Sequence, residues 1–66
     1  MKIVLNGDIL ETESGCTVDS LLLKLGISRD RVAIELNAEI IPKASYDIQL
    51  LSDGDKIEIV HFVGGG

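Results

Sequence analysis

The sequence has very little of several residue types from which small proteins build functional sites. It contains one cysteine, Cys16, and one histidine, His61, which excludes an internal disulfide and is too few for a closed zinc site. Its two aromatic residues, Tyr46 and Phe62, cannot form a platform on which nucleic-acid bases stack. Basic residues are also scarce, six against eleven acidic ones, and the net charge of −5 opposes binding to nucleic acids and anionic membranes.

Long apolar runs are absent as well. No segment approaches the roughly 20 residues that a membrane-spanning helix needs. The first residues, MKIVLNGD, lack the apolar stretch and cleavage site of a signal peptide. We therefore expect a cytoplasmic protein. Its acidic surface suits either a basic protein partner or solubility alone, and both interpretations stay open.

Apolar residues are nevertheless plentiful. They make up 45% of the 66 residues, mostly Ile, Leu and Val, which is enough for the packed core of one small domain. Disorder is excluded on the same ground.

Alternation of apolar and polar residues predicts most of the strands. In the first strand Ile3 and Leu5 should face inward, and the Asn6-Gly7 pair that follows favours a type I′ hairpin turn. Pro42 should end a short strand at a sheet edge. The predicted strands cover residues 2–6, 8–13, 31–36, 39–41 and 56–63.

From Val18 onward the spacing of apolar residues changes from the alternation of a strand to the α-helical period of about 3.6 residues. Thr17 suits the N-cap position, and Gly26 suits the left-handed position that closes a helix, with Ile27 as the accompanying apolar contact. Four apolar side chains recur at i, i+3, i+4 and i+7 on one helical face: Val18, Leu21, Leu22 and Leu25.

The element order is hairpin, helix, strand, short strand, crossover and strand. One helix covers only one face of such a sheet, so the other face stays open. We predict an α+β fold of the β-grasp (ubiquitin-like) class, with a mixed sheet of four to five strands. The domain should span residues 1–63, with an irregular crossover at 43–52, and residues 64–66 should form a flexible glycine tail.

The open face of the sheet is the first candidate site. Side-chain parity places Val60 and Phe62 there, and Val4 as well. If the first and last strands are neighbours, these three residues form an exposed apolar patch that could bind a partner. Scattered surface hydrophobic residues are the plainer interpretation.

The glycine tail, Gly64-Gly65-Gly66, is the second candidate site. It could be a frayed end, but glycines can also thread a narrow tunnel and place a terminal carboxylate beside a nucleotide. A carboxylate becomes electrophilic once ATP converts it to an acyl-adenylate. The chain has no glycine-rich phosphate loop before a helix, so a separate protein must do the adenylation.

The remaining polar residues favour structural interpretations. Cys16 has no base nearby in the sequence, and His61 is expected to be structural or solvent-facing. The pair Asp53 and Asp55 belongs to a tight turn rather than a calcium site. In the loop after the helix, Arg29 and Arg31 are predicted to be surface residues.

Three segments together resemble the ThiS family of sulfur carriers from thiamine biosynthesis. These are IELNAEIIPK, LSDGDKIEIVHFV and the terminal GGG, and the resemblance extends from MKIVLNGD to the end. Its most specific part is DGDKIEIV at 53–60. Many relatives have only two terminal glycines, so Gly64 is a departure that affects how the last strand is placed.

The resemblance implies a role and a set of partners. Gly66 would be adenylated by an E1-like adenylyltransferase of the ThiF type, which uses ATP, while the carrier itself binds no cofactor and is no enzyme. Sulfur drawn from cysteine, by a donor such as a cysteine desulfurase, would convert the adenylate to a thiocarboxylate. A thiazole synthase of the ThiG type would accept that sulfur.

Other functions share these features. A ubiquitin-like modifier uses the same activated tail to form isopeptide bonds, and a molybdopterin-type sulfur carrier uses it for another product. A β-grasp binding module would use the patch and leave the tail inert. An independent enzyme is disfavoured, because no nucleophile, base and oxyanion site converge.

Overall fold

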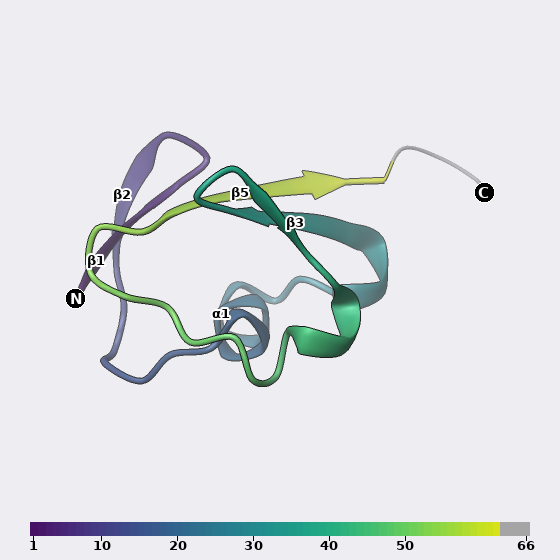
Figure 1. The fold of residues 1–66 in the computed structure, drawn as a ribbon, viewed down its shortest axis with the longest axis horizontal. Coiled ribbons are helices and arrows are strands. Elements are labelled where there is room, and N and C mark those ends of the chain that lie inside the picture. Colours follow the sequence, from purple (N-terminus) through teal and green to yellow (C-terminus); the bar gives the residue numbers. More distant parts are fainter. Residues whose placement is uncertain (63–66) are drawn as a thin grey trace.

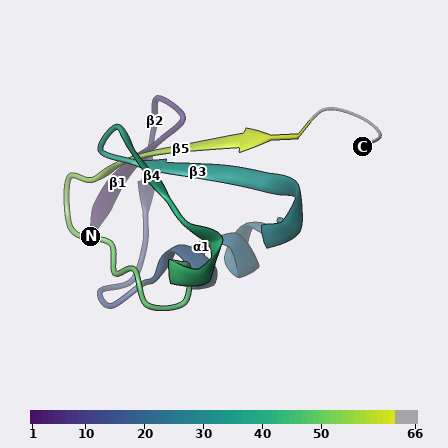
Figure 2. The ribbon, with the colours of Figure 1, turned by 45° about the vertical axis from the view of Figure 1, so that its right-hand side comes forward.

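The computed structural model describes residues 1–62, which form a five-stranded mixed sheet packed on one α-helix (Figure 1). The helix and the crossover lie on one side of the sheet, and the other face is uncovered (Figure 2). This confirms the predicted α+β architecture. The strands are β1 (Lys2–Leu5), β2 (Asp8–Glu11), β3 (Val32–Leu36), β4 (Glu39–Ile41) and β5 (Lys56–His61).

The strand order β2-β1-β5-β3-β4 places the last strand in the centre of the sheet. β1 and β5 are parallel, and the other neighbouring pairs are antiparallel. The first and last strands are therefore neighbours, as the patch prediction required. The predicted edge strand β4 does lie at an edge, and Pro42 follows it.

Both hairpin turns have the left-handed backbone that their sequences require. Asn6 and Gly7 have φ values of 47° and 86°, as the predicted type I′ turn needs. Asn37 and Ala38 make the equivalent turn with φ values of 51° and 70°. Because Ala38 carries a Cβ, it is strained in this conformation in a way that a glycine would not be.

Helix α1 (Val18–Leu25) begins and ends at the predicted residues. Thr17 and Ser20 form a reciprocal capping box: the Ser20 amide donates to Thr17 Oγ1 at 3.1 Å, and the Thr17 amide donates to Ser20 Oγ at 2.7 Å. At the other end Gly26 has φ of 70°, and the amides of Gly26 and Ile27 donate back into the last turn. This is the Schellman arrangement.

The core lies between α1 and the covered face of the sheet. The predicted inward residues of β3 are buried, and so is Tyr46, which follows the short 3₁₀ turn η2 (Lys43–Ser45) in the crossover. Leu25, expected on the buried helical face, is 36% exposed because it lies at the helix end. The buried apolar set is Ile3, Val18, Leu21, Leu22, Val32, Ile34, Leu36, Tyr46, Leu51, Ile57 and Ile59.

Arg29 is more than the surface residue that the sequence predicted. It lies in the 3₁₀ turn η1 (Arg29–Arg31) and its guanidinium donates to the Lys43 carbonyl at 2.7 Å. The same group lies 3.6 Å from Asp19 Oδ1 and over the Tyr46 ring, 5.5 Å from its centroid. Arg29 thus ties the loop after α1 to the crossover, while its side chain remains 38% exposed at the surface.

Asn6 extends the β1–β5 pairing with its side chain. Its Oδ1 accepts from the Ile59 amide at 2.7 Å and its Nδ2 donates to the Ile59 carbonyl at 3.2 Å. The side-chain amide of Asn6 thus makes the two hydrogen bonds to Ile59 that the backbone of a longer β1 strand would otherwise make. It holds β5 in place beyond the point where β1 turns away.

We expect Asn6→Gly to lower the free energy of unfolding by about 1–2 kcal/mol, because two hydrogen bonds are lost while glycine keeps the turn conformation. Asn6→Ala should cost about 1 kcal/mol more, since alanine resists positive φ. Urea denaturation of the three proteins measures both terms. An unchanged unfolding free energy in Asn6→Gly would show that the residue acts through the turn alone.

Candidate functional site

The predicted tail follows the central strand. β3 pairs with β5 as far as His61, and the Phe62 amide still donates to the Arg31 carbonyl at 2.9 Å. The chain is therefore held by a neighbouring strand up to its last described residue. The end of β5 lies on the opposite side of the molecule from the N-terminus (Figure 1). The predicted site residues Gly64, Gly65 and Gly66 lie outside the described residues.

The predicted apolar patch divides into two parts. Val60 and Phe62 are 52% and 59% exposed at the C-terminal end of β5. Val4 pairs with Lys56 and is half-buried, which places it about 13 Å from Val60 along the strand, at 3.3 Å per residue. The three residues therefore do not form one contiguous patch. Val4 instead neighbours the exposed Ile9 of β2.

Two acidic residues on the open face lie between the two apolar parts. Glu35 of β3 and Glu58 of β5 are direct cross-strand partners. They line a shallow hollow of about 500 Å³ with Asn37, Ala38 and Lys56. Side-chain parity places both residues on the open face, but their opposition could not be predicted from the sequence, because only the strand register brings them together.

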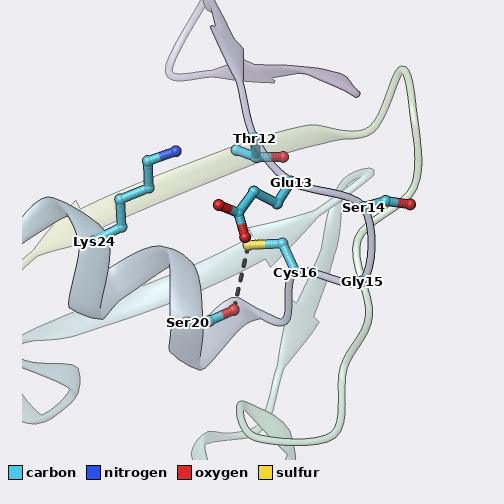
Figure 3. A pocket seen from close by; sticks show the side chains of 7 residues that line it. All are labelled: Thr12, Glu13, Ser14, Gly15, Cys16, Ser20 and Lys24. Atoms are coloured by element: carbon cyan, nitrogen blue, oxygen red, sulfur yellow. Dashed lines mark hydrogen bonds between the residues drawn. The ribbon is translucent and has the colours of Figure 1, made fainter.

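A second hollow, of about 510 Å³, lies between the start of α1 and the loop after β2 (Figure 3). It contains the half-buried Cys16, whose Sγ is 3.3 Å from Ser20 Oγ. The lining residues include no histidine, and His61 lies on β5 opposite Val32. Cys16 and His61 thus have different neighbours, and the hollow offers the thiol no imidazole base.

Asp53 and Asp55 both hold backbone in place. Asp53 Oδ1 accepts from the Lys2 amide at 2.7 Å. Asp55 accepts from the Ser52 amide at 2.7 Å and from Asn37 Nδ2 at 3.0 Å. These bonds join the turn before β5 to β1 and to the β3–β4 turn, as the structural interpretation expects.

Two absences hold for residues 1–62. No group of three or more His, Cys, Asp or Glu side chains is placed to hold a metal ion. No helix in this part of the chain combines the length and apolar character needed to cross a membrane.

Known proteins match this chain along its whole length. The ThiS family model matches residues 3–66. The sulfur carrier protein ThiS of Bacillus subtilis is 44% identical over 63 residues, which is 94% of this chain and 96% of that protein. The crystal structure of the thiamine biosynthesis protein ThiS from Geobacter metallireducens has a TM-score of 0.86 and 30% identity, and the match covers all of both chains.

Longer proteins match as well. The thiazole synthase of Paramagnetospirillum magneticum is 48% identical over all 66 residues, and that of Magnetococcus marinus is 42% identical. This chain spans only 20% of the length of either. Each of these synthases therefore contains a segment of this kind together with a much larger remainder.

The family model covers nearly the whole chain, and the solved ThiS structure has the same arrangement of sheet and helix. The chain therefore belongs to the ThiS family, the small β-grasp sulfur carriers of thiamine biosynthesis.

Proposed function

We propose that this chain carries sulfur as a thiocarboxylate on Gly66 and delivers it to a thiazole synthase. The observation that carries the proposal is the family match, which includes the three glycines that follow β5. The fold suits this role because the central strand is held on one side by β3 up to Phe62. A fixed strand followed by a glycine tail limits how far from the domain the carboxylate can reach, and the absence of side chains in the tail lets it enter a narrow site.

The chemistry requires two displacements. A Gly66 carboxylate oxygen attacks the α-phosphorus of ATP, and pyrophosphate leaves. Hydrosulfide then attacks the acyl carbon to form the C–S bond, and AMP leaves with both electrons of the broken C–O bond. Where a cysteine desulfurase is the donor, its persulfide sulfur reaches the hydrosulfide level by taking two electrons from thiols, which are oxidised to a disulfide. An E1-like adenylyltransferase catalyses the first step, so the carrier acts as a substrate and holds no cofactor. The proposal requires the α-carboxylate of Gly66 to be free.

Thiazole synthase is the proposed acceptor because two related proteins of that name contain a segment similar to this whole chain. A domain linked covalently to its partner acts at a high effective concentration. A separate carrier has no such linkage and needs an interface of its own.

Intact-mass measurement tests the carrier chemistry. The chain is incubated with ATP, sulfide and an E1-like adenylyltransferase. A mass increase equal to the replacement of one oxygen by one sulfur is the expected result. Attachment to lysines of other proteins without this increase would favour the ubiquitin-like modifier, and no reaction with the enzyme would favour a binding module with an inert tail.

We propose the exposed pair Val60 and Phe62 as part of the partner surface, because it lies just before the tail on the uncovered face. Val60→Asp should weaken binding to thiazole synthase about tenfold, which corresponds to about 1.4 kcal/mol. Ile9→Asp is the matched control, since Ile9 is 73% exposed on the distant β2. Calorimetric titration measures both affinities, and equal losses in the two variants would contradict the assignment.

A further inference from the structure

Glu35 and Glu58 lie directly opposite each other on the open face of the sheet. They are cross-strand partners in the antiparallel β3–β5 pair. Two residues further along this ladder the Asn37 amide donates to the Lys56 carbonyl, and four residues in the other direction the Phe62 amide donates to the Arg31 carbonyl. This alternation makes Glu35 and Glu58 a hydrogen-bonded pair, with Cα atoms about 5.5 Å apart and both side chains on one face. Like charges in this position repel each other.

The described part of the chain does not neutralise this pair. Its ion pairs are Arg29–Asp19 and Lys43–Asp30, neither of which includes a glutamate of the open face. Lys56 lies on the same face and lines the same hollow, but its Nζ is not within 4 Å of either carboxylate. Neither glutamate therefore takes part in an ion pair of the described residues, and the nearby Lys56 charge offsets part of their repulsion.

The surroundings of the pair are suited to a protein surface. Ile40, opposite Glu35 on β4, is 77% exposed, and Val60, the next open-face residue after Glu58, is 52% exposed. A partner that covers these apolar side chains would also exclude water from the carboxylates. Electrostatic attraction to a cation strengthens when water is excluded.

We propose that Glu35 and Glu58 together bind one arginine side chain of the thiazole synthase surface that receives the tail. The planar guanidinium presents several N–H donors in a fixed fork, so one arginine can bond both carboxylates, whereas a lysine acts as a point charge. The hollow of about 500 Å³ leaves room for this group. The inference rests on the proposed function, because it takes thiazole synthase as the partner.

The test combines thermal unfolding with calorimetric binding of the complete chain to thiazole synthase. Glu35→Gln and Glu58→Gln should each raise the unfolding temperature by about 1–6 °C, because repulsion is relieved. Each should also weaken binding about tenfold and reduce the dependence of the affinity on salt. Glu11→Gln is the matched control: it removes the same charge from β2, where Glu11 lies opposite Lys2. It should change the affinity less than about twofold and should not raise the unfolding temperature.

A higher unfolding temperature together with weaker binding in the glutamate variants would support the inference. Substitution of a residue with a purely structural role should instead lower both stability and affinity. Unchanged affinity in both glutamate variants would overturn it, as would an equal loss in Glu11→Gln, which would reflect net charge alone. Both of these outcomes presuppose that the unaltered chain binds thiazole synthase, so they would overturn the inference without contradicting the proposed function. If the unaltered chain does not bind thiazole synthase at all, both this inference and the proposed acceptor are overturned.

Discussion

Deletion of Gly66 is expected to abolish thiocarboxylate formation while leaving the unfolding temperature of the domain unchanged. Among the described residues the buried core ends at Ile59, and the last backbone hydrogen bond to a neighbouring strand is that of the Phe62 amide. Gly66 follows four residues later and has no side chain to pack, so we expect its deletion to leave the core intact. It does withdraw the terminal carboxylate by one residue, about 3.5 Å. Since a misplacement of about 1 Å can cost about a hundredfold in rate, Gly65 should not replace Gly66.

Intact mass after incubation with ATP, sulfide and the adenylyltransferase measures the first effect, and thermal unfolding measures the second. Gly66→Ala keeps the length of the chain and serves as the matched variant. It should react more slowly than the unaltered chain, because a Cβ then lies beside the reacting carbonyl. A thiocarboxylate on the shortened chain would contradict the assignment to Gly66, and a lower unfolding temperature would indicate a structural tail.

The elements that the sequence predicted well are those whose causes are local. Thr17 and Gly26 lie within a turn of the helix that they bound, and the Asn6-Gly7 pair defines its own hairpin. Such signals act over a few residues, so no knowledge of the rest of the chain is needed. Strand ends were less well predicted: the second strand stops at Glu11 rather than at residue 13. Element boundaries depend on which neighbours continue the pairing.

Features that depend on register were not predictable from the sequence. Parity correctly placed Val60 on the open face, but the parallel pairing puts Val4 opposite Lys56, about 13 Å from Val60. The opposition of Glu35 and Glu58 depends on register in the same way. Parity gives the face of a sheet on which a residue lies, and register gives its neighbour on that face.

Long-range polar contacts were missed for a related reason. Arg29 bonds the Lys43 carbonyl and lies over the Tyr46 ring, although 14 and 17 residues separate these positions in the chain (43 − 29 and 46 − 29). Nothing in the local sequence of the loop distinguishes Arg29 from its neighbour Arg31, which is exposed. The tail, in contrast, could be recognised directly, because a run of glycines is a feature of the sequence itself.

Ile57→Ala is expected to destabilise the domain by about 2–5 kcal/mol. Ile57 is 1% exposed in the central strand, with Leu5 on one side and Leu36 on the other. Truncation of this side chain leaves a cavity, and β1 and β3 cannot move in to close it because both are paired with β5. A domain of 66 residues has a total stability of about 3–10 kcal/mol, so the variant should be substantially unfolded near 37 °C. Urea denaturation followed by circular dichroism measures the change.

Two substitutions in the same sheet separate cavity formation from other effects. Ile57→Val removes one methylene group and should cost only about 0.5–1.5 kcal/mol. Ile40→Ala removes the same atoms as Ile57→Ala from a side chain that is 77% exposed, and it should change the unfolding free energy by less than about 0.5 kcal/mol. Equal losses in Ile57→Ala and Ile40→Ala would contradict the central position of Ile57 in the core. A graded series, with Ile57→Val between the other two, would show that the small domain depends on complete packing beneath β5. That packing fixes the strand from which the glycine tail extends, so a core defect should also impair delivery of the carboxylate.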